Sequence, residues 1–74
     1  MSAAILVAIS FNGETRDVPA GLMLSDVLRH AGLDPTQPGI AVAQNGDIVR
    51  RAAWTESEVE RGDELEVITA TQGG

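Results

Sequence analysis

Two Asn-Gly dipeptides, Asn12-Gly13 and Asn45-Gly46, place the strongest constraint on how this chain folds. Asn and Gly accept the positive φ values that a tight type I′ hairpin turn requires. Each dipeptide follows a segment rich in β-branched and aliphatic residues, 4–11 in the first case and 40–44 in the second. The sequence therefore predicts two β-hairpins. The first ends near Pro19, because proline cannot donate a hydrogen bond to a sheet ladder.

An amphipathic helix is predicted between the hairpins, within residues 22–31. Its apolar residues recur at positions i, i+3, i+4 and i+7 of one stripe: Leu24, Val27, Leu28 and Ala31. Gly32 is the expected C-terminal stop. Met23 occupies the start of the helix, where Ser or Thr is the preferred cap.

A last strand is predicted over residues 64–69, after an irregular or single-turn segment at 51–54. The element order ββαβββ predicts a two-layer α+β fold, in which one helix packs across a mixed sheet. The ubiquitin-like β-grasp fold is the compact version of this arrangement, with the first and last strands side by side in the sheet centre. The near-continuous apolar run Ile5–Ile9 suggests burial on more than one side. We expect a β-grasp domain at 1–69 and a flexible tail at 70–74.

Composition excludes several classes of function. At 74 residues the chain is too short to form a deep substrate cleft, so a self-contained enzyme is not expected. It has no cysteine, which excludes disulfides, thiolate nucleophiles and zinc ribbons. Eleven acidic residues against five basic ones give a net charge of −6, which disfavours nucleic acid and anionic membranes as partners. The N-terminal apolar run lacks a basic flank and is too short to span a membrane, so a cytoplasmic protein is expected.

The C-terminal tail, residues 70–74, is the segment for which the sequence predicts a chemical role. Residues 70–74 are small or polar, and nothing in their pattern predicts packing on the core. An extended chain from Thr69 to Gly74 reaches on the order of 20 Å, at about 3.3 Å per residue, which is enough to enter the active site of another protein. Gly73 has no Cβ and would pass through a narrow channel, so the free carboxylate of Gly74 is the predicted working group. A frayed, inert terminus is the alternative.

Other polar and aromatic residues have structural interpretations. His30 is expected at the surface near the end of the helix, and no metal site is predicted. Trp54 is expected to pack on the sheet rather than to anchor a partner. Arg51 or Arg61 could form weak surface ion pairs. The acidic residues near the C-terminus are predicted to form a solvated face rather than catalytic carboxylate pairs: Glu56, Glu58, Glu60, Asp63, Glu64 and Glu66.

A set of motifs spans nearly the whole chain: Asn12-Gly13, Ala20-Gly21, the stretch 41–49, Arg51 and Trp54 in the pattern V-x-R-x-x-W, Gly62-Asp63, and Gly73-Gly74. Together these motifs resemble the ThiS family, the bacterial sulfur carriers of thiamine biosynthesis. The resemblance implies a carrier that is not itself an enzyme and binds no cofactor. The Gly74 carboxylate would be adenylated by an E1-like adenylyltransferase that uses ATP-Mg. A persulfide from a cysteine desulfurase would then convert it to a thiocarboxylate, which donates sulfur at thiazole synthase.

Related functions share the fold and the tail. A sulfur carrier of another pathway, such as the small subunit of molybdopterin synthase, is one alternative. A ubiquitin-like modifier that forms isopeptide bonds through Gly74 is a second, and an interaction module with an inert tail is a third. The complete absence of lysine prevents self-linked chains through lysine and favours the carrier.

Overall fold

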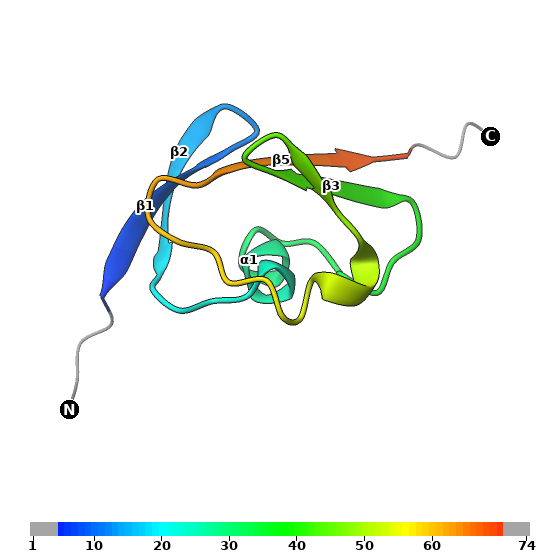
Figure 1. Cartoon of the computed structure of the whole chain (residues 1–74), viewed down its shortest axis with the longest axis horizontal. Helices are drawn as coiled ribbons and strands as arrows, with labels where there is room; N and C mark the ends of the chain where they lie inside the picture. Colours follow the sequence, from blue (N-terminus) through cyan, green and yellow to red (C-terminus); the bar gives the residue numbers. More distant parts are fainter. Residues whose placement is uncertain (1–4, 71–74) are drawn as a thin grey trace.

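Five strands form one mixed sheet in the order β2-β1-β5-β3-β4 (Figure 1). The computed structural model describes residues 5–70. Its elements are β1 (Leu6–Phe11), β2 (Glu14–Pro19), α1 (Leu24–His30), β3 (Ile40–Gln44), β4 (Asp47–Val49), the 3-10 helix η1 (Arg51–Ala53) and β5 (Glu64–Thr69). The hairpins β1-β2 and β3-β4 are antiparallel, while β1 and β5 pair in parallel at the sheet centre. The predicted ββαβββ order and β-grasp fold are confirmed. Residues 71–74, most of the predicted tail, lie outside the described residues.

Both hairpin turns have the predicted backbone geometry. Asn12 and Asn45 have φ angles of 51° and 53°, and the glycines that follow them have φ angles of 84° and 87°. A left-handed pair of this kind matches the twist of the strands on either side. The two Asn-Gly dipeptides therefore act as the sequence predicts.

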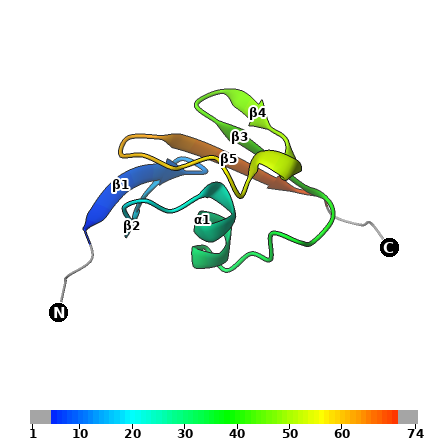
Figure 2. The ribbon, with the colours of Figure 1, turned by 60° about the horizontal axis from the view of Figure 1, so that its bottom comes forward.

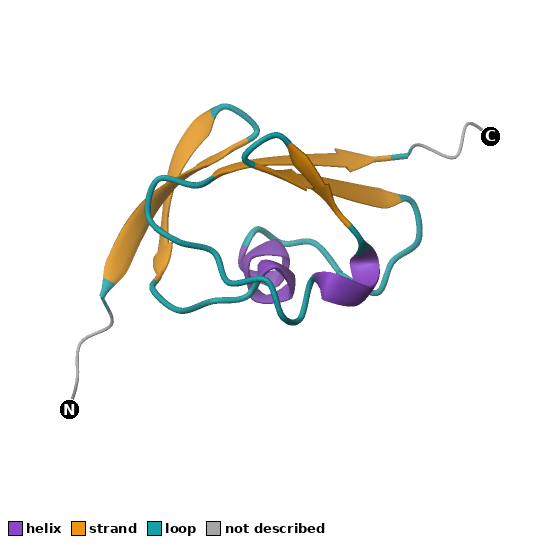
Figure 3. Ribbon diagram, viewed as in Figure 1, coloured by secondary structure: helices purple, strands orange, loops and turns teal. Residues whose placement is uncertain are grey.

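Helix α1 lies across one face of the sheet, as Figures 2 and 3 show. It ends in a Schellman motif, in which the N–H of Leu33 donates to the carbonyl oxygen of Leu28 and the N–H of Gly32 to that of Arg29, both at 2.9 Å. Gly32 has a φ of 89°, so the predicted stop is confirmed. At the other end, Asp26 accepts a hydrogen bond from the N–H of Met23 at 3.1 Å. This bond satisfies the backbone N–H of Met23 itself, the residue that precedes the helix, while the Met23 side chain makes no capping hydrogen bond to the first turn.

The helix is shorter than the predicted 22–31. Residues 22 and 23 are extended because they pair with the segment before β5: the N–H of Val59 donates to Leu22 at 2.8 Å, and Met23 forms a β-bridge with Glu58. The core between helix and sheet consists of these buried apolar side chains: Val7, Ile9, Phe11, Val18, Leu24, Val27, Leu28, Ile40, Val42, Trp54, Val59, Leu65 and Val67.

The prediction of two-sided burial for Ile5–Ile9 is wrong. Val7 and Ile9 are buried, but Ile5 and Leu6 are 69% and 55% exposed. The physical reason is that β1 is central within the sheet, while the helix covers only one of the two sheet faces. The apolar residues of β1 therefore alternate between the core and the open face. No helix within residues 5–70 is long and apolar enough to cross a membrane.

Candidate functional site

The tail leaves the domain from the end of β5, beside the loop that precedes β3. We call Thr69 and Ala70 the tail root. The N–H of Ala70 donates to the carbonyl oxygen of Gly39 at 2.6 Å. Gly39 has a φ of 84°, and a Cβ at this position would lie 3.3 Å from the Cβ of Ala70. Glycine thus permits both the turn and the close approach of the two backbones. Gly73 and Gly74, the predicted working residues, lie outside the described residues.

Strand β5 is held on one side by the side chain of Asn12. Strand β1 pairs with β5 at Ser10 and Phe11. Beyond these two residues, the side chain of Asn12 binds the backbone of β5 in place of β1. Its Nδ2 donates to the carbonyl oxygen of Val67 at 3.2 Å, and its Oδ1 accepts from the N–H of Val67 at 2.7 Å. The side-chain amide therefore extends the parallel ladder toward the tail root.

Asn45 holds β5 from the other hairpin. Its backbone N–H donates to the carbonyl oxygen of Glu64 at 2.8 Å, and its Oδ1 accepts from the N–H of Glu64 at 2.8 Å. Its Nδ2 donates to Asp63 at 3.0 Å. From the sequence, both Asn residues were predicted only to form turns. Their side-chain amides were the sequence feature that could have indicated hydrogen bonds to another strand, because glycine at the same position would have sufficed for the turn.

Asp63 belongs to this polar network and not to the predicted solvated face. It is buried, and its carboxylate accepts hydrogen bonds from Gln44 and from the N–H of Glu60, each at 2.8 Å, in addition to Asn45. Burial alone would raise the pKa of Asp63, but the hydrogen bonds from Asn45, Glu60 and Gln44 outweigh it and hold the pKa below its usual value. The other five acidic side chains of the predicted face are exposed.

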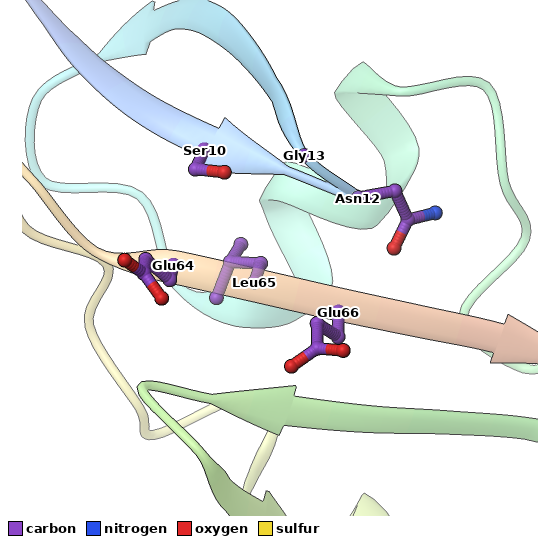
Figure 4. Close-up of a pocket in the computed structure, with 6 residues that line it drawn as sticks. All are labelled: Ser10, Asn12, Gly13, Glu64, Leu65 and Glu66. Carbon is purple, nitrogen blue, oxygen red and sulfur yellow. The ribbon is translucent and has the colours of Figure 1, made fainter.

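An open groove of about 540 Å³ lies between the β1-β2 turn and β5 (Figure 4). It is lined by Ser10, Asn12, Gly13, Glu64, Leu65 and Glu66. It presents a hydroxyl, an amide and two exposed carboxylates, which suits recognition of a basic partner surface better than acid-base catalysis. Within residues 5–70, no three His, Cys, Asp or Glu side chains gather where they could hold a metal ion. His30 is exposed at the end of α1.

Trp54 and Arg51 form a packed unit next to the loop that precedes β3. Trp54 is 2% exposed, and its Nε1 donates to the carbonyl oxygen of Val49 at 2.9 Å, which confirms the predicted packing role. The guanidinium of Arg51 lies 4.5 Å from the centre of the Trp54 ring. It also donates to the carbonyl oxygens of Pro35 and Gln37, the latter at 2.8 Å. The suggested surface ion pair of Arg51 is therefore wrong, because its donors bind backbone carbonyls.

The open face of the sheet carries an apolar patch, which consists of Ala41, Ala43, Ile48 and Ile68. Register places Ala43 opposite Ile48 and Ala41 opposite Ile68. Ile48 is 75% exposed and Ile68 is 67% exposed. The patch reaches to within two residues of Ala70, so it lies at the same end of β5 as the tail root.

Comparison with known proteins places these features in a family. The ThiS family model matches residues 9–74, which includes both Asn-Gly turns, the Arg51-Trp54 unit and Gly73-Gly74. This chain belongs to the ThiS family. The crystal structure of a ThiS thiamine biosynthesis protein from Geobacter metallireducens has the same fold, with a TM-score of 0.76 and 24% sequence identity over 92% of this chain and 100% of that chain. The comparison with curated proteins gives no match.

The structure explains two motifs of this ThiS chain. In the pattern V-x-R-x-x-W, Val49 supplies a carbonyl to Trp54, and Trp54 supplies a platform to Arg51. In Gly62-Asp63, the carboxylate of Asp63 binds the β3-β4 hairpin at Gln44 and Asn45. Both motifs are thus structural, and Gly62-Asp63 directly precedes β5, the strand that carries the tail.

Proposed function

We propose that this chain is the sulfur carrier of thiamine biosynthesis, with the Gly74 carboxylate as the group that carries sulfur. Membership of the ThiS family, whose members are small sulfur-carrier proteins, is the observation that supports the proposal. The match extends through Gly74. The fold adds that the strand before the tail is held from both hairpins, so the domain offers a rigid base for a reactive terminus.

The proposed chemistry begins with activation. A carboxylate is a poor electrophile, so an E1-like adenylyltransferase first joins a Gly74 oxygen to the α-phosphorus of ATP, with Mg²⁺, and pyrophosphate leaves. A persulfide supplied by a cysteine desulfurase then attacks the carbonyl carbon, and AMP leaves. A thiol next attacks the resulting acyl disulfide, forming a new disulfide and releasing the Gly74 thiocarboxylate. Thiazole synthase is the proposed acceptor of its sulfur.

Within this proposal the protein supplies recognition, and its partners supply catalysis. The apolar patch lies on the open sheet face at the tail end of β5, and the exposed carboxylates of Glu64 and Glu66 lie on the same strand. An apolar centre with an acidic rim suits an adenylating partner whose docking surface is apolar with basic residues around it. A surface of that kind would bind the domain while the tail enters the partner's active site.

Intact-mass measurement tests the proposal. The full chain is incubated with the adenylating partner, ATP-Mg, the desulfurase, cysteine and a thiol. We expect the mass change that corresponds to replacement of one oxygen by sulfur. The variant that lacks Gly74 should not react and should melt at the same temperature, while Gln72→Ala, which keeps the tail length, should still react.

The other outcomes separate the alternatives. Adducts on the lysines of other proteins would favour a ubiquitin-like modifier. Transfer of the sulfur to a pterin precursor but not to thiazole synthase would favour a carrier for molybdopterin. An unchanged mass without ATP–pyrophosphate exchange would contradict both the carrier and the modifier.

A further inference from the structure

The loop between α1 and β3 connects the Arg51-Trp54 unit to the tail root. Figure 3 shows this loop passing from the end of α1, beside η1, to the start of β3. Arg51 binds it at Pro35 and Gln37, and two residues later Gly39 accepts the hydrogen bond of Ala70. A continuous series of contacts thus runs from a buried tryptophan to the last residue before 71–74.

Each contact in this series restricts the next one. Trp54 is buried and hydrogen-bonded, so it offers Arg51 a fixed surface. The guanidinium is planar with its donors in a rigid fork, so it holds two carbonyl oxygens in a defined relation to each other. Pro38 then limits φ between Gln37 and Gly39. The position of the Gly39 carbonyl oxygen therefore depends on the Arg51 fork.

The loop is stiffened further by its own turn. Asp34 accepts hydrogen bonds from the N–H and the hydroxyl of Thr36 at 2.9 and 2.6 Å, and the N–H of Gln37 donates to the carbonyl oxygen of Asp34 at 3.0 Å. Such an Asx turn shapes the segment locally. It does not itself attach the loop to the rest of the domain, whereas Arg51 hydrogen-bonds it from η1.

We propose that Arg51 is a positioning residue for the tail root: by holding the loop at Pro35 and Gln37, it sets the place where Ala70 leaves the domain. The consequence for activity rests on the proposed function. Four residues beyond Ala70 reach at most about 14 Å, at about 3.5 Å per residue. Over that length, the direction of the root decides where the Gly74 carboxylate can lie once the domain has docked. Acyl activation is sensitive to misplacement of the reacting atoms, so a loose root lowers the rate.

The first test is structural and does not depend on the function. NMR hydrogen exchange of the Ala70 amide is compared in the full-length wild type, Arg51→Met, Arg51→Lys and the matched control Arg50→Met, whose exposed residue is adjacent in sequence. We expect both Arg51 variants to exchange Ala70 several-fold faster and the control to match wild type. The Val67 amide, bound by Asn12, reports on β5 itself and should not change.

Three results of this test would overturn the proposal. The first is an unchanged Ala70 rate in Arg51→Met. The second is an equal acceleration at Val67, which would show a general loss of stability. The third is a wild-type rate in Arg51→Lys, which keeps the charge but cannot bridge two carbonyls in the same way, because this would show that charge alone is sufficient.

The second test measures ATP–pyrophosphate exchange by the adenylating partner as a function of carrier concentration. A positioning role predicts that Arg51→Met lowers the maximal rate several-fold, while KM for the carrier stays near the wild-type value because the apolar patch is intact. Faster Ala70 exchange with an unchanged maximal rate would overturn the role in activation. If the wild-type chain supports no exchange at all, the proposed function fails, and the Ala70 measurement still decides whether Arg51 holds the root.

Discussion

The side chain of Asn12 makes both backbone hydrogen bonds of Val67, donating to its carbonyl oxygen at 3.2 Å and accepting from its N–H at 2.7 Å. Asn12, a residue of the β1-β2 turn, thus makes the hydrogen bonds to β5 that a further residue of β1 would otherwise make. The arrangement leaves β1 short and keeps β5 bound on this side as far as Val67.

Asn12→Gly keeps the positive φ of the turn and removes only the side-chain amide. We expect the free energy of unfolding to fall by about 1 to 3 kcal/mol, because both polar groups of Val67 lose their partner. Urea denaturation followed by circular dichroism measures the change. Asn12→Asp retains an acceptor for the N–H of Val67 but no donor for its carbonyl, so it should also be destabilised. A loss below about 0.5 kcal/mol in Asn12→Gly would show that water replaces the amide without cost.

Asp63→Asn tests the buried carboxylate that binds the β3-β4 hairpin at Gln44 and Asn45. An amide cannot accept from Gln44, Asn45 and the N–H of Glu60 together, so we expect a loss of about 1 to 3 kcal/mol at neutral pH. The matched control Glu66→Gln, at an exposed carboxylate of β5, should change stability by less than about 0.5 kcal/mol. Equal effects in the two variants would contradict the buried network.

The same carboxylate predicts how stability depends on pH. The folded pKa of Asp63 lies below the usual 3.8, so between the two values the unfolded chain binds more protons than the folded chain. This contribution to stability is therefore complete above the unfolded pKa and is lost as the pH falls from about 4 through the folded pKa. Asp63→Asn should flatten the acid limb of a plot of unfolding free energy against pH. Some slope should remain, since the hydroxyl and N–H of Thr36 also lower the pKa of Asp34.

A double-mutant cycle tests the contact between Arg51 and Trp54. Trp54→Leu removes the hydrogen bond to Val49 and the aromatic ring, and should cost about 2 to 4 kcal/mol. Combined with Arg51→Met, it should show a coupling energy of about 0.5 to 1 kcal/mol, the range for a cation over an aromatic ring near the surface. Additive losses in thermal or urea denaturation would mean that the stacking contributes no stability of its own.

The apolar patch should affect docking more than folding. Ile48→Thr and Ile68→Thr keep β-branched residues at exposed strand positions, so each should change stability by less than about 0.5 kcal/mol. Each should weaken binding to the adenylating partner by about 1 to 2 kcal/mol, as measured by calorimetry. Ile5→Thr, which is equally exposed but lies outside the patch, is the control. Wild-type affinity in both patch variants would place the docking surface elsewhere.

Much of the fold followed from local patterns in the sequence. The Asn-Gly turns, the apolar stripe of α1 and its Gly32 stop depend on residues within a few positions of one another, so their geometry is set by local steric and hydrogen-bonding preferences. The pairing of β1 with β5 could be predicted only because the ββαβββ order is that of the β-grasp fold, and no local pattern in either strand indicates it. Two-sided burial of Ile5–Ile9 was wrongly inferred, because the sequence of a strand does not reveal whether a second layer covers its other face.

By itself, the sequence determined the order of elements, the two turns and Gly74 as the candidate working group. The tertiary structure decided what the polar side chains bind: Asn12 meets Val67 across 55 positions, Asp63 meets Gln44 across 19, and Arg51 meets Pro35 across 16. The physical reason is that turn and helix preferences act between near neighbours, whereas a side-chain donor can be assigned a partner only when the packed layers have brought distant backbone groups to it. Those distant contacts join the tail root to the core.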